Sequence, residues 1–568
     1  MEQWLVSMKK ADFGAIASRF DIDPVTARLI RNRGLTEFSE IDKYLNGTLN
    51  DLYPPALLKD MDRACGIISE KISQKKRIRV IGDYDIDGIM STYILLSGLK
   101  RLGALADERI PERIRDGYGL NENLVKSAHA DSVDTIITCD NGISAYEQIR
   151  LAKELGMTVI VTDHHEVPFD AETSAQIIPP ADAVIDPKQD MCSYPFKGLC
   201  GAVVAWKLIS CLYSKHGVPQ NEAENFLMFA AIATVGDVCD LQDENRIIVK
   251  YGIEQLAHSK HYGLNALMSL NGLDPAAITT YHIGFIIGPC LNASGRLDTA
   301  EKALALMNAA SENEAIDLAS ELINMNQSRK EMTEEYAKKA YEIAESEELS
   351  SDRVLVVYLP DCHESLAGII AGRLREKYNK PAFVITDSES GAKGSGRSID
   401  EYSMYTELVK CGGLMTQFGG HPKAAGLSLE KDNIDMLREA LNANCVLTEE
   451  DLAKKIHADM VLPLRYITES LINDFEKLKP FGQGNPRPLF VQKELSVISP
   501  SVVGKNRNVV RMQLSDRSGC RIPAVYFGDA DAFMEYISDK KEISAVFYPA
   551  INTFRGVSSI QLTITNYR

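Results

Sequence analysis

Short apolar runs alternate with helical patterns in the first third of the chain. Runs rich in β-branched residues occupy 77–82, 134–139 and 157–162, and SAYEQIRLAKELG has helical spacing between the second and the third. This alternation predicts a parallel α/β sheet. Ligands bind beyond the carboxyl ends of the strands in such sheets. The polar residues that follow each run are therefore the first candidates for a functional site.

The flanking segments are predicted to be mainly helical. Residues 1–75 and 200–330 carry apolar residues at helical spacing. Within the second segment, IIGPCLNASGRLD (286–298) is rich in Gly, Pro and Asn, and we expect a loop there. Residues 301–349 contain neither Gly nor Pro, which predicts one long helix or a helical hairpin between two domains.

The C-terminal part predicts two further folding units. Strand-like runs at 354–359 and 382–386 flank a helical patch, and a Gly-rich loop and the cluster FGGHPKAAG follow. Beyond residue 460, five short strand patterns alternate with turns. Such a series suits a small β-barrel of the OB type.

Composition changes this picture little. The chain has 568 residues, of which 45% are hydrophobic and 25% charged, as in a globular protein of several domains. Its eleven cysteines include no CxxC pair, which favours reduced thiols in a cytoplasmic protein over thiolate-bound metal. We find neither a secretory leader nor an apolar run long enough for a membrane span, and so expect no membrane association.

The net charge of −17 argues mildly against a protein that coats nucleic acid, because such proteins usually carry a basic surface. The acidic residues are unevenly spread, however. Residues 301–353 alone contain 13 acidic and 6 basic side chains. A basic groove elsewhere in the chain remains compatible with the overall charge.

Four clusters carry the candidate chemistry. The first, Asp83-Tyr84-Asp85-Ile86-Asp87-Gly88, directly follows a strand pattern. An EF-hand loop is excluded because its twelfth position would be Ile94, where a bidentate Glu is required. A solvated turn is the alternative that the motif alone leaves open.

The other clusters also end apolar runs. Asp140 follows the second run, Asp163-His164-His165 the third, and Asp237 ends FLMFAAIATVG, where an acid would oppose the helix dipole. Four such clusters at element ends predict one shared site. Carboxylates with one or two imidazoles favour Mn²⁺ or Mg²⁺, and so many ligands suit two ions, an arrangement that serves displacement at phosphorus.

In this order, DYDIDG, CDNG, DHH and GD resemble the motifs of the DHH phosphoesterase superfamily. The resemblance extends to its single-strand-specific 5′→3′ DNA exonucleases through IPERIRDGYGLN, YPFKGLCGAVVAWKL, GPCLNASGRLD, GSGRS, FGGHPKAAG and PFGQGNPRP. It runs from residue 77 to residue 568.

The resemblance implies an α/β protein with five parts. These are a helical N-terminal segment (1–75), a DHH-type parallel-sheet catalytic domain (76–300), a connecting helix (301–350), a second α/β, DHH-associated substrate-binding domain (351–455) and a C-terminal OB-like nucleic-acid-binding barrel (456–568).

It also implies a role for individual residues. Asp85 and Asp87 match metal-binding acids, and Asp83 an acid of the same motif. Asp140 matches an acid that bridges both ions, His164 and Asp237 match further ligands, and His165 matches a catalytic histidine near the scissile phosphate. The residues that match nucleic-acid or phosphate contacts are Arg113, Tyr118, Asn292, Arg296, Ser395, Arg397, Gly420 and His421.

Two near-matches to other enzymes fail. GAKGSGRS (391–398) has Arg397 where a phosphate-binding P-loop needs Lys. A nucleophile elbow of the G-x-S-x-G type is missing from the sequence. Trp206 in an apolar helix is expected in the core, whereas Phe547 and Tyr548 suit either core packing or base stacking.

The predicted function is metal-dependent 5′→3′ hydrolysis of single-stranded DNA in repair and recombination. One alternative is a DHH phosphodiesterase for short oligonucleotides or cyclic dinucleotides, and another is a catalytically inactive DNA-binding scaffold. The resemblance implies a RecQ-type helicase and a single-strand-binding protein as partners. We expect a cytoplasmic monomer.

Overall fold

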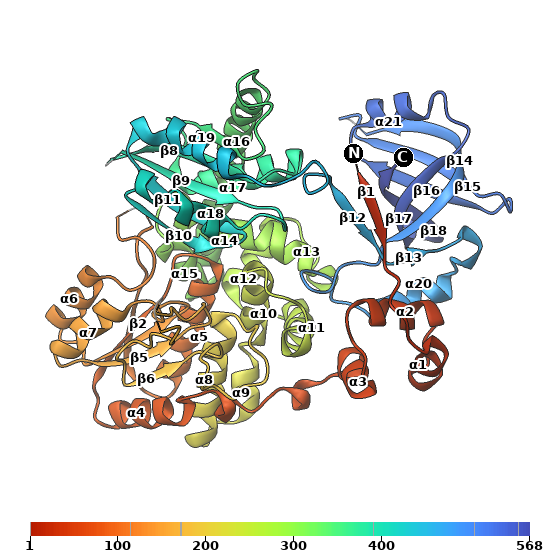
Figure 1. The fold of residues 1–568 in the computed structure, drawn as a ribbon. Helices are drawn as coiled ribbons and strands as arrows, with labels where there is room; N and C mark the ends of the chain where they lie inside the picture. The colour runs from red at the N-terminus through yellow and green to blue at the C-terminus, as the bar shows by residue number, and fades with distance from the viewer. Residues whose placement is uncertain (1, 114, 171–172, 390, 505, 555) are drawn as a thin grey trace. The chain divides into compact units, whose positions relative to one another are not determined.

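The computed structural model describes residues 2–113, 115–170, 173–389, 391–504, 506–554 and 556–568 (Figure 1). The chain forms two units. The first consists of Met1–Gln3, Cys290–Lys302 and Asp317–Ile456, and the second of Trp4–Pro289, Ala303–Ile316 and His457–Arg568.

The second unit contains the predicted parallel sheet. Its strands are β2 (Arg77–Ile81), β3 (Leu105–Arg109), β4 (Thr135–Cys139), β5 (Thr158–Thr162) and β6 (Ala183–Ile185). They pair in the order β3-β2-β4-β5-β6, all parallel. The chain changes direction across the sheet between β2 and β4. This switch point is where parallel sheets bind ligands.

Helices cover the sheet on both faces. They are α4 (Met61–Ser73), α5 (Ile86–Arg101), α6 (Glu122–Ala130), α7 (Tyr146–Glu154) and α8 (Gly201–Lys215). Helices α4 and α5 both pack on α8, whereas α6 packs on α7. Val125 of α6 and Ile149 of α7 share a buried cluster with Ile136 of β4. Strands β2, β4, β5 and β6 are therefore buried on both sides, as their mainly apolar sequences require, whereas the edge strand β3 is partly exposed.

A helical subdomain follows α8. Its helices are α9 (Gln220–Glu224), α10 (Leu227–Gly236), α11 (Asp243–Ala257), α12 (Tyr262–Leu270) and α13 (Thr280–His282), with a π-helical turn at Ile283–Ile287. Helix α10 packs on α5, α8 and α11. Trp206 of α8 is buried and donates its indole N–H to the Ala223 carbonyl, as expected of a core residue.

The C-terminal barrel contains the five strands predicted from the sequence. Its strands are β14 (Phe490–Val503), β15 (Val509–Ser515), β16 (Arg521–Phe527), β17 (Ile543–Phe554) and β18 (Val557–Tyr567). They pair in the order β14-β15-β16-β18-β17, and β17 returns to β14. Helix α21 (Ala530–Ile537) lies between β16 and β17, and the short β13 (Met460–Val461) pairs in parallel with the start of β14. Phe547 is fully buried, so its side chain serves the core.

The N-terminal helices share the core of the barrel. They are α1 (Phe13–Phe20), α2 (Pro24–Asn32) and α3 (Phe38–Asn46), and α20 (Glu469–Glu476) joins them. Leu29 and Ile30 are fully buried in one cluster with Leu471 and Phe490. Residues 1–75 also include β1 (Gln3–Val6), which pairs with β12 (Lys455–Ala458).

The first unit is built on a mixed sheet. Its strands are β7 (Leu355–Tyr358), β8 (Ala382–Ser388), β9 (Gly391–Arg397), β10 (Gln417–His421) and β11 (Ala424–Leu429), in the order β10-β11-β9-β8-β7. Only β7 and β8 are parallel. Its helices are α17 (Glu364–Tyr378), α18 (Met404–Lys410), α19 (Ile434–Asn444) and most of α14 (Gly288–Leu297) and α16 (Glu312–Ala344), whereas α15 (Glu301–Met307) lies mainly in the second unit. Short 3₁₀ turns occupy Leu49–Asp51, Pro55–Leu57, Pro275–Ala277, Gly412–Leu414, Lys431–Asn433 and Leu464–Tyr466.

Two local predictions were wrong. Residues 286–298 are not a loop but the end of the π-helical turn and helix α14. Pro289 directly follows the π-helical turn inside a continuous helical run from Thr280 to Leu297, and the buried Leu291 and Ala293 outweigh the weak helix propensity of Gly, Pro and Asn. The supposed Gly-rich loop around 394–398 is largely strand β9, which pairs with β8 and β11. Position 396 is glycine because a Cβ there would come within 2.5 Å of the Phe383 ring.

Two expected absences can be compared with the described residues. None of the helices in the described part of the chain is both long and apolar enough to cross a membrane. All eleven cysteines are free thiols.

The P-loop near-match lies on β9 rather than before a helix N-terminus, so its backbone has no phosphate-cradling geometry.

Candidate metal centre

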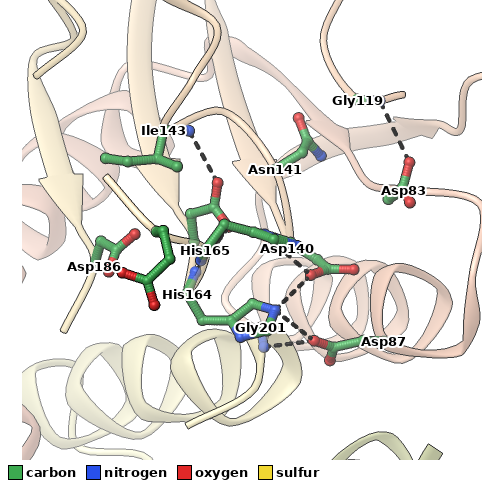
Figure 2. A network of polar contacts seen from close by, with 12 residues as sticks. Asp83, Asp87, Gly119, Asp140, Asn141, Ile143, His164, His165, Asp186 and Gly201 are labelled. Carbon is green, nitrogen blue, oxygen red and sulfur yellow. Dashed lines mark hydrogen bonds and ion pairs between the residues drawn. The ribbon is translucent and has the colours of Figure 1, made fainter. Parts of the chain in front are cut away.

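The predicted acidic and histidine clusters meet at the carboxyl ends of the central strands. Asp83 follows β2, Asp140 follows β4, and Asp163 follows β5. Because these strands are neighbours and parallel, their ends lie at one edge of the sheet. Figure 2 shows the side chains converging there with His164, His165 and Asp87.

The turn from β2 into α5 places the three acids of the first motif. Asp85 caps α5 and accepts hydrogen bonds from the N–H groups of Asp87 (3.0 Å) and Gly88 (3.2 Å). A Cβ on Gly88 would lie 2.3 Å from the Asp83 carbonyl oxygen, so the turn requires glycine. Asp83 is buried and accepts from the Gly119 N–H at 3.3 Å.

Asp87 is held by the N-terminus of a second helix. Its two carboxylate oxygens accept hydrogen bonds from the N–H groups of Gly201 (2.6 Å) and Ala202 (2.7 Å), which begin α8. The unpaired N–H groups and the dipole of a helix N-terminus both stabilise a carboxylate. A Cβ on Gly201 would lie 2.8 Å from that of Asp140, so this close approach also depends on glycine.

His164 lies among three carboxylates. Its Nε2 is 3.0 Å from Oδ1 of Asp140, 3.4 Å from Oδ2 of Asp87 and 3.9 Å from Oδ2 of Asp237. Burial lowers the pKa of His164, although the neighbouring carboxylates oppose this. A buried neutral imidazole surrounded by carboxylate oxygens is suited to bind a metal ion.

His165 is held in the opposite protonation state. Its Nδ1 donates to Oδ1 of Asp163 at 2.8 Å. Burial alone would lower its pKa, but this hydrogen bond and the nearby negative charge raise the pKa to about 9. The same contact brings the pKa of Asp163 to about 2 despite complete burial. In the metal-free protein this pKa makes His165 an imidazolium at neutral pH.

Asp237 is the C-cap of α10, the position that the sequence analysis had disfavoured. Burial and then the charge of Asp87 raise its pKa to about 7, and the Cys239 thiol donates to its Oδ2 at 3.2 Å. Burial and neighbouring carboxylates also raise the pKa of Asp83 and of Asp140 well above the usual range. This excess of buried negative charge is what a bound divalent cation would neutralise.

The ligand atoms form three overlapping groups in which all members lie within 4.8 Å of one another. These groups are Asp83-Asp85-Asp140, Asp87-His164-Asp237 and Asp140-His164-His165. The first two share no residue, and Asp140 joins them through its contact with His164. Carboxylates with one neutral imidazole suit hard divalent ions. The geometry fits two such ions.

Arg113 and Tyr118 lie beside the centre. The Tyr118 hydroxyl donates to the Asp140 carbonyl at 2.8 Å and lies 3.2 Å from the ring nitrogens of His165. The Arg113 guanidinium lies 4.8 Å from the centre of the Tyr84 ring, which contacts Tyr118 edge to face.

Sequence reasoning did not assign a role to three polar residues of this centre. Asp163 orients both histidines, and Asn141 donates to the carbonyls of Ile81 and Cys139, which ties the ends of β2 and β4 together. Asp186 follows β6 and is fully buried; burial and Asp163 raise its pKa to about 7. The sequence did indicate Asp186, because this acidic residue directly follows the apolar run AVI, as the other acids of the centre follow theirs.

The remaining predicted residues lie in the first unit. Arg397 of β9 and His421 of β10 both pair with Ala424 of β11. The three side chains therefore form one row on the same face of the sheet. Ser395 lies on that face too, and its Oγ accepts from Nη1 of Arg397 at 3.2 Å. Gly420 has a φ of 141°, and a Cβ there would lie 2.4 Å from the Ala424 carbonyl oxygen.

Helices α14 and α17 bring further groups to the same region. Nη1 of Arg296 donates to the Ser365 carbonyl at 2.9 Å, in the first turn of α17. A Cβ on Gly368 would lie 2.8 Å from Arg397 Nη2, so α17 approaches that side chain closely. Asn292 has a buried amide oxygen without a hydrogen-bond partner. The predicted site residues thus form two sets, one in each unit.

Models of known families match three segments of the chain. They are the DHH family, N-terminal domain (77–234), the DHHA1 domain (351–446) and the RecJ OB domain (458–566). The single-stranded-DNA-specific exonuclease RecJ of Escherichia coli is 31% identical over 96% of this chain and 96% of its own length. The protein belongs to the RecJ family.

Other RecJ proteins extend this relation. The Bacillus subtilis RecJ is 34% identical over 97% of this chain and 68% of its own length. The crystal structure of Thermus thermophilus RecJ in complex with Mn²⁺ has a TM-score of 0.85 at 26% identity, and the match covers 100% of this chain and 79% of that one. The same RecJ with Mg²⁺ gives 0.79 at 25% identity over 100% and 78%. The predicted fold class, with its DHH, DHH-associated and OB domains, is therefore confirmed.

Proposed function

We propose that the protein is a metal-dependent exonuclease that hydrolyses single-stranded DNA from its 5′ end in repair and recombination. The observation that carries this proposal is the cluster of carboxylates and one neutral imidazole at the switch point of the sheet. RecJ relatives with a similar sequence are named single-stranded-DNA-specific exonucleases, and one binds Mn²⁺ or Mg²⁺.

In this proposal two divalent ions, Mn²⁺ or Mg²⁺, occupy the centre. Asp83, Asp85 and Asp140 hold one ion, while Asp87, His164 and Asp237 hold the other, with Asp140 between them. Such ions supply a hydroxide nucleophile and neutralise charge on the reacting phosphate. The protein orients these ligands through the N-termini of α5 and α8 and through Asn141.

His165 supplies a proton to this chemistry. Asp163 keeps the His165 ring protonated at neutral pH, and the Tyr118 hydroxyl lies 3.2 Å from the ring nitrogens. An imidazolium at this position contributes positive charge to a phosphate oxygen and can donate its proton to the leaving oxygen. Arg113 adds a second cation beside Tyr84, where it would contact the phosphate backbone.

The first unit supplies phosphate contacts. Arg296, Arg397 and His421 offer charge-assisted hydrogen bonds, Ser395 a hydroxyl, and Asn292 an amide beside the same helix. Gly420 lets the strand β10 turn without a side chain in the way. We assign residues 351–455 to substrate binding on this basis, 76–300 to catalysis, 301–350 to the connection and 456–568 to nucleic-acid binding.

The OB domain gives the proposal its substrate class, because OB barrels bind single strands through stacking and backbone contacts. A single-strand-binding protein and a RecQ-type helicase would present such strands, and we propose them as partners of a cytoplasmic monomer. Residues 1–75 support this arrangement, since α1 to α3 complete the core of the barrel.

A labelled oligonucleotide tests the proposal. The protein is incubated with Mn²⁺ and a single strand labelled at its 5′ end, and a second strand labelled at its 3′ end is followed in parallel. The 5′ label should leave as a mononucleotide from the first time points, whereas the 3′ label should stay on a ladder of shortening strands. Asp140→Asn should remove the activity, and Glu342→Gln, at an exposed carboxylate of α16, should leave it unchanged.

Other outcomes decide between the alternatives. Intact strands at low salt, with hydrolysis of dinucleotides, would replace the proposal with a phosphodiesterase for short oligonucleotides or cyclic dinucleotides. Binding of DNA without cleavage under any divalent ion would leave only the scaffold. The complete set of ligand side chains argues against that last reading.

A further inference from the structure

A large cavity lies next to the metal centre within the second unit. It has a volume of about 800 Å³. Four segments line it: the end of α10 with the residues after it (235–241), helix α11 at 250–254, the turn at 278–285, and the loop 476–487 that leads into the barrel. The volume is in the range of cavities that enclose a ligand of several rings.

One wall of the cavity adjoins the metal ligands. Gly236 and Val238, the neighbours of Asp237 in the chain, both line it. Val238 has a φ of 59° and is 64% exposed. A β-branched residue in the left-handed region is strained, and such strain concentrates at functional sites. The cavity therefore begins beside the reaction centre.

The second wall carries an exposed pair of aromatic rings. Tyr281 is 60% exposed and Phe285 is 66% exposed, and the two rings stack with centroids 4.9 Å apart and an angle of 27°. Phe285 stands on the π-helical turn, a distortion of helices that is frequent at functional sites, and Tyr281 stands on α13 directly before it. Large apolar rings that face a cavity and not the core offer their free faces to a flat ligand.

The third wall connects the cavity to the barrel. Thr280 Oγ1 donates to the Phe481 carbonyl at 2.5 Å, and the Leu241 N–H donates to the Gln483 carbonyl at 2.8 Å, so the loop is fixed to the helical subdomain. Arg487 lines the cavity and places its guanidinium 4.5 Å from the centre of the Tyr548 ring on β17. The cavity thus extends from the chain neighbours of Asp237 to Arg487, which contacts a strand of the OB domain.

Charge at this cavity suits a polyanion with apolar rings. Lys250, Lys479 and Arg487 line it together with Glu254 and Glu476. Lys479 is paired with Glu476 at 2.6 Å, whereas Arg487 faces an aromatic ring. In a chain of net charge −17, a net positive, aromatic-walled cavity is a local exception. Stacking rings next to cations are the features that bind single-stranded nucleic acid.

We infer that this cavity holds unpaired bases of the DNA strand on the 3′ side of the scissile phosphate, stacked on Tyr281 and Phe285. Arg487 contacts the backbone of the same stretch of DNA, and the strand then continues past Tyr548 onto the barrel. The inference rests on the proposed exonuclease function. It makes the aromatic pair a determinant of strand binding rather than of the chemical step.

A comparison of long and short substrates tests this role. The variants are Tyr281→Ala, Phe285→Ala and the double change, with Phe285→Tyr as the conservative variant. Loss of one stacked base should raise KM for a long single strand between about five- and 100-fold. The kcat for that strand should stay within about twofold. Hydrolysis of a dinucleotide, which has only one base on the 3′ side of the scissile phosphate, should be affected less than hydrolysis of the long strand.

A matched control separates the cavity from a general surface effect. Tyr262, at the start of α12, is 48% exposed and does not line the cavity. Tyr262→Ala should leave KM for both substrates as in the parent protein, and Phe285→Tyr should restore most of the affinity. Equal losses on long strand and dinucleotide would overturn the inference, as would an unchanged KM for the long strand in the double variant.

A spectroscopic measurement keeps the test independent of turnover. Strands carrying a single 2-aminopurine at successive positions are bound to Asp140→Asn protein, in which the strand stays intact. Fluorescence should be quenched at one or two positions near the 5′ end, and Phe285→Ala should remove that quenching. Quenching that does not depend on Tyr281 or Phe285 would refute the inference. Absence of cleavage by the parent protein would instead refute the proposed function.

Discussion

Asp163 and His165 form a hydrogen-bonded ion pair in which Nδ1 of the imidazole lies 2.8 Å from Oδ1 of the carboxylate. The same oxygen accepts from the backbone N–H groups of His164 (2.7 Å) and His165 (3.2 Å), while Oδ2 accepts from Ile143. One buried carboxylate therefore sets the orientation of both histidines. Asp163 also separates the protonation states of the two histidines, because only the His165 ring donates a hydrogen bond to it.

Asp163→Asn should move the alkaline limb of the pH–activity profile to lower pH. Without the carboxylate, burial dominates and the pKa of His165 falls from about 9 toward or below its ordinary 6.5. Activity that needs the imidazolium would then disappear above neutral pH. The measurement is kcat/KM from pH 5.5 to 9.5. A profile that keeps its alkaline limb near pH 9 would exclude this role for His165.

The same pair should contribute to stability over a defined pH window in the metal-free protein. The pKa of His165 is raised, so its contribution is complete below about pH 6.5 and disappears as pH rises through 9. The pKa of Asp163 is lowered, so its contribution is complete above about pH 3.8 and disappears as pH falls through 2. Urea unfolding in EDTA should show the largest deficit of Asp163→Asn near pH 5, and a smaller one at pH 9.5.

Binding of Mn²⁺ should strengthen as pH rises through 7. The pKa of Asp237 is raised to about 7, so below that pH a proton competes with the ion for this carboxylate. The dissociation constant from calorimetry should fall by up to about tenfold per pH unit between pH 5.5 and 7, and then level off. Asp237→Asn should bind more weakly at pH 8 and show a flatter pH dependence. Parallel curves for parent and variant would contradict the assignment of Asp237 as a ligand.

Asp186→Asn should stabilise the metal-free protein at alkaline pH. Asp186 is fully buried beside Asp163, and its pKa is raised from 3.8 to about 7, so ionisation costs stability as pH rises through this range. The shift of about three units sets a ceiling of about 4 kcal/mol on the gain at pH 8. Asn keeps an acceptor for the Lys188 N–H, now 2.7 Å from Oδ1. Urea unfolding at pH 8 and pH 5 measures the difference, and an equal change at both would show that ionisation is not its cause.

Arg246 should couple the helical subdomain to the barrel. Its buried guanidinium donates to the carbonyls of Tyr44 (2.8 Å), Leu478 (2.8 Å) and Lys477 (3.0 Å), which belong to α3 and to the loop before the barrel. Arg246→Met leaves these buried acceptors without a donor, which should cost on the order of 3 kcal/mol. Calorimetry should show the barrel and N-terminal helices unfolding at a lower temperature than the catalytic sheet.

An exposed ion pair provides the control for Arg246. Arg101 and Glu222 form a bidentate contact at the surface. Arg101→Met should leave the unfolding profile unchanged, because solvent screens such pairs. A parent-like profile for Arg246→Met would show that the two parts are held together by other contacts.

The chemistry of the centre could be predicted from the sequence because parallel strands bring their carboxyl ends to one edge. Asp83, Asp140 and His164 each follow an apolar run, so their convergence follows from the fold class alone. The five strands of the barrel were predictable for a similar reason, since short alternating runs between turns are a local pattern. The family resemblance then identified which of the clustered residues belong together.

Tertiary packing decided what local pattern could not. Residues 288–297 form a helix although Gly, Pro and Asn are frequent there, because burial of Leu291 and Ala293 outweighs propensity. Gly396 lies in a strand because β9 pairs with β8 and β11, and the close contact with Phe383 leaves no room for a side chain at this position. The loop 476–487 that shares a cavity with Tyr281 and Phe285, and the burial of His165 near Asp87 and Asp237, bring together segments distant in sequence, and such neighbours have no signature in the residues themselves.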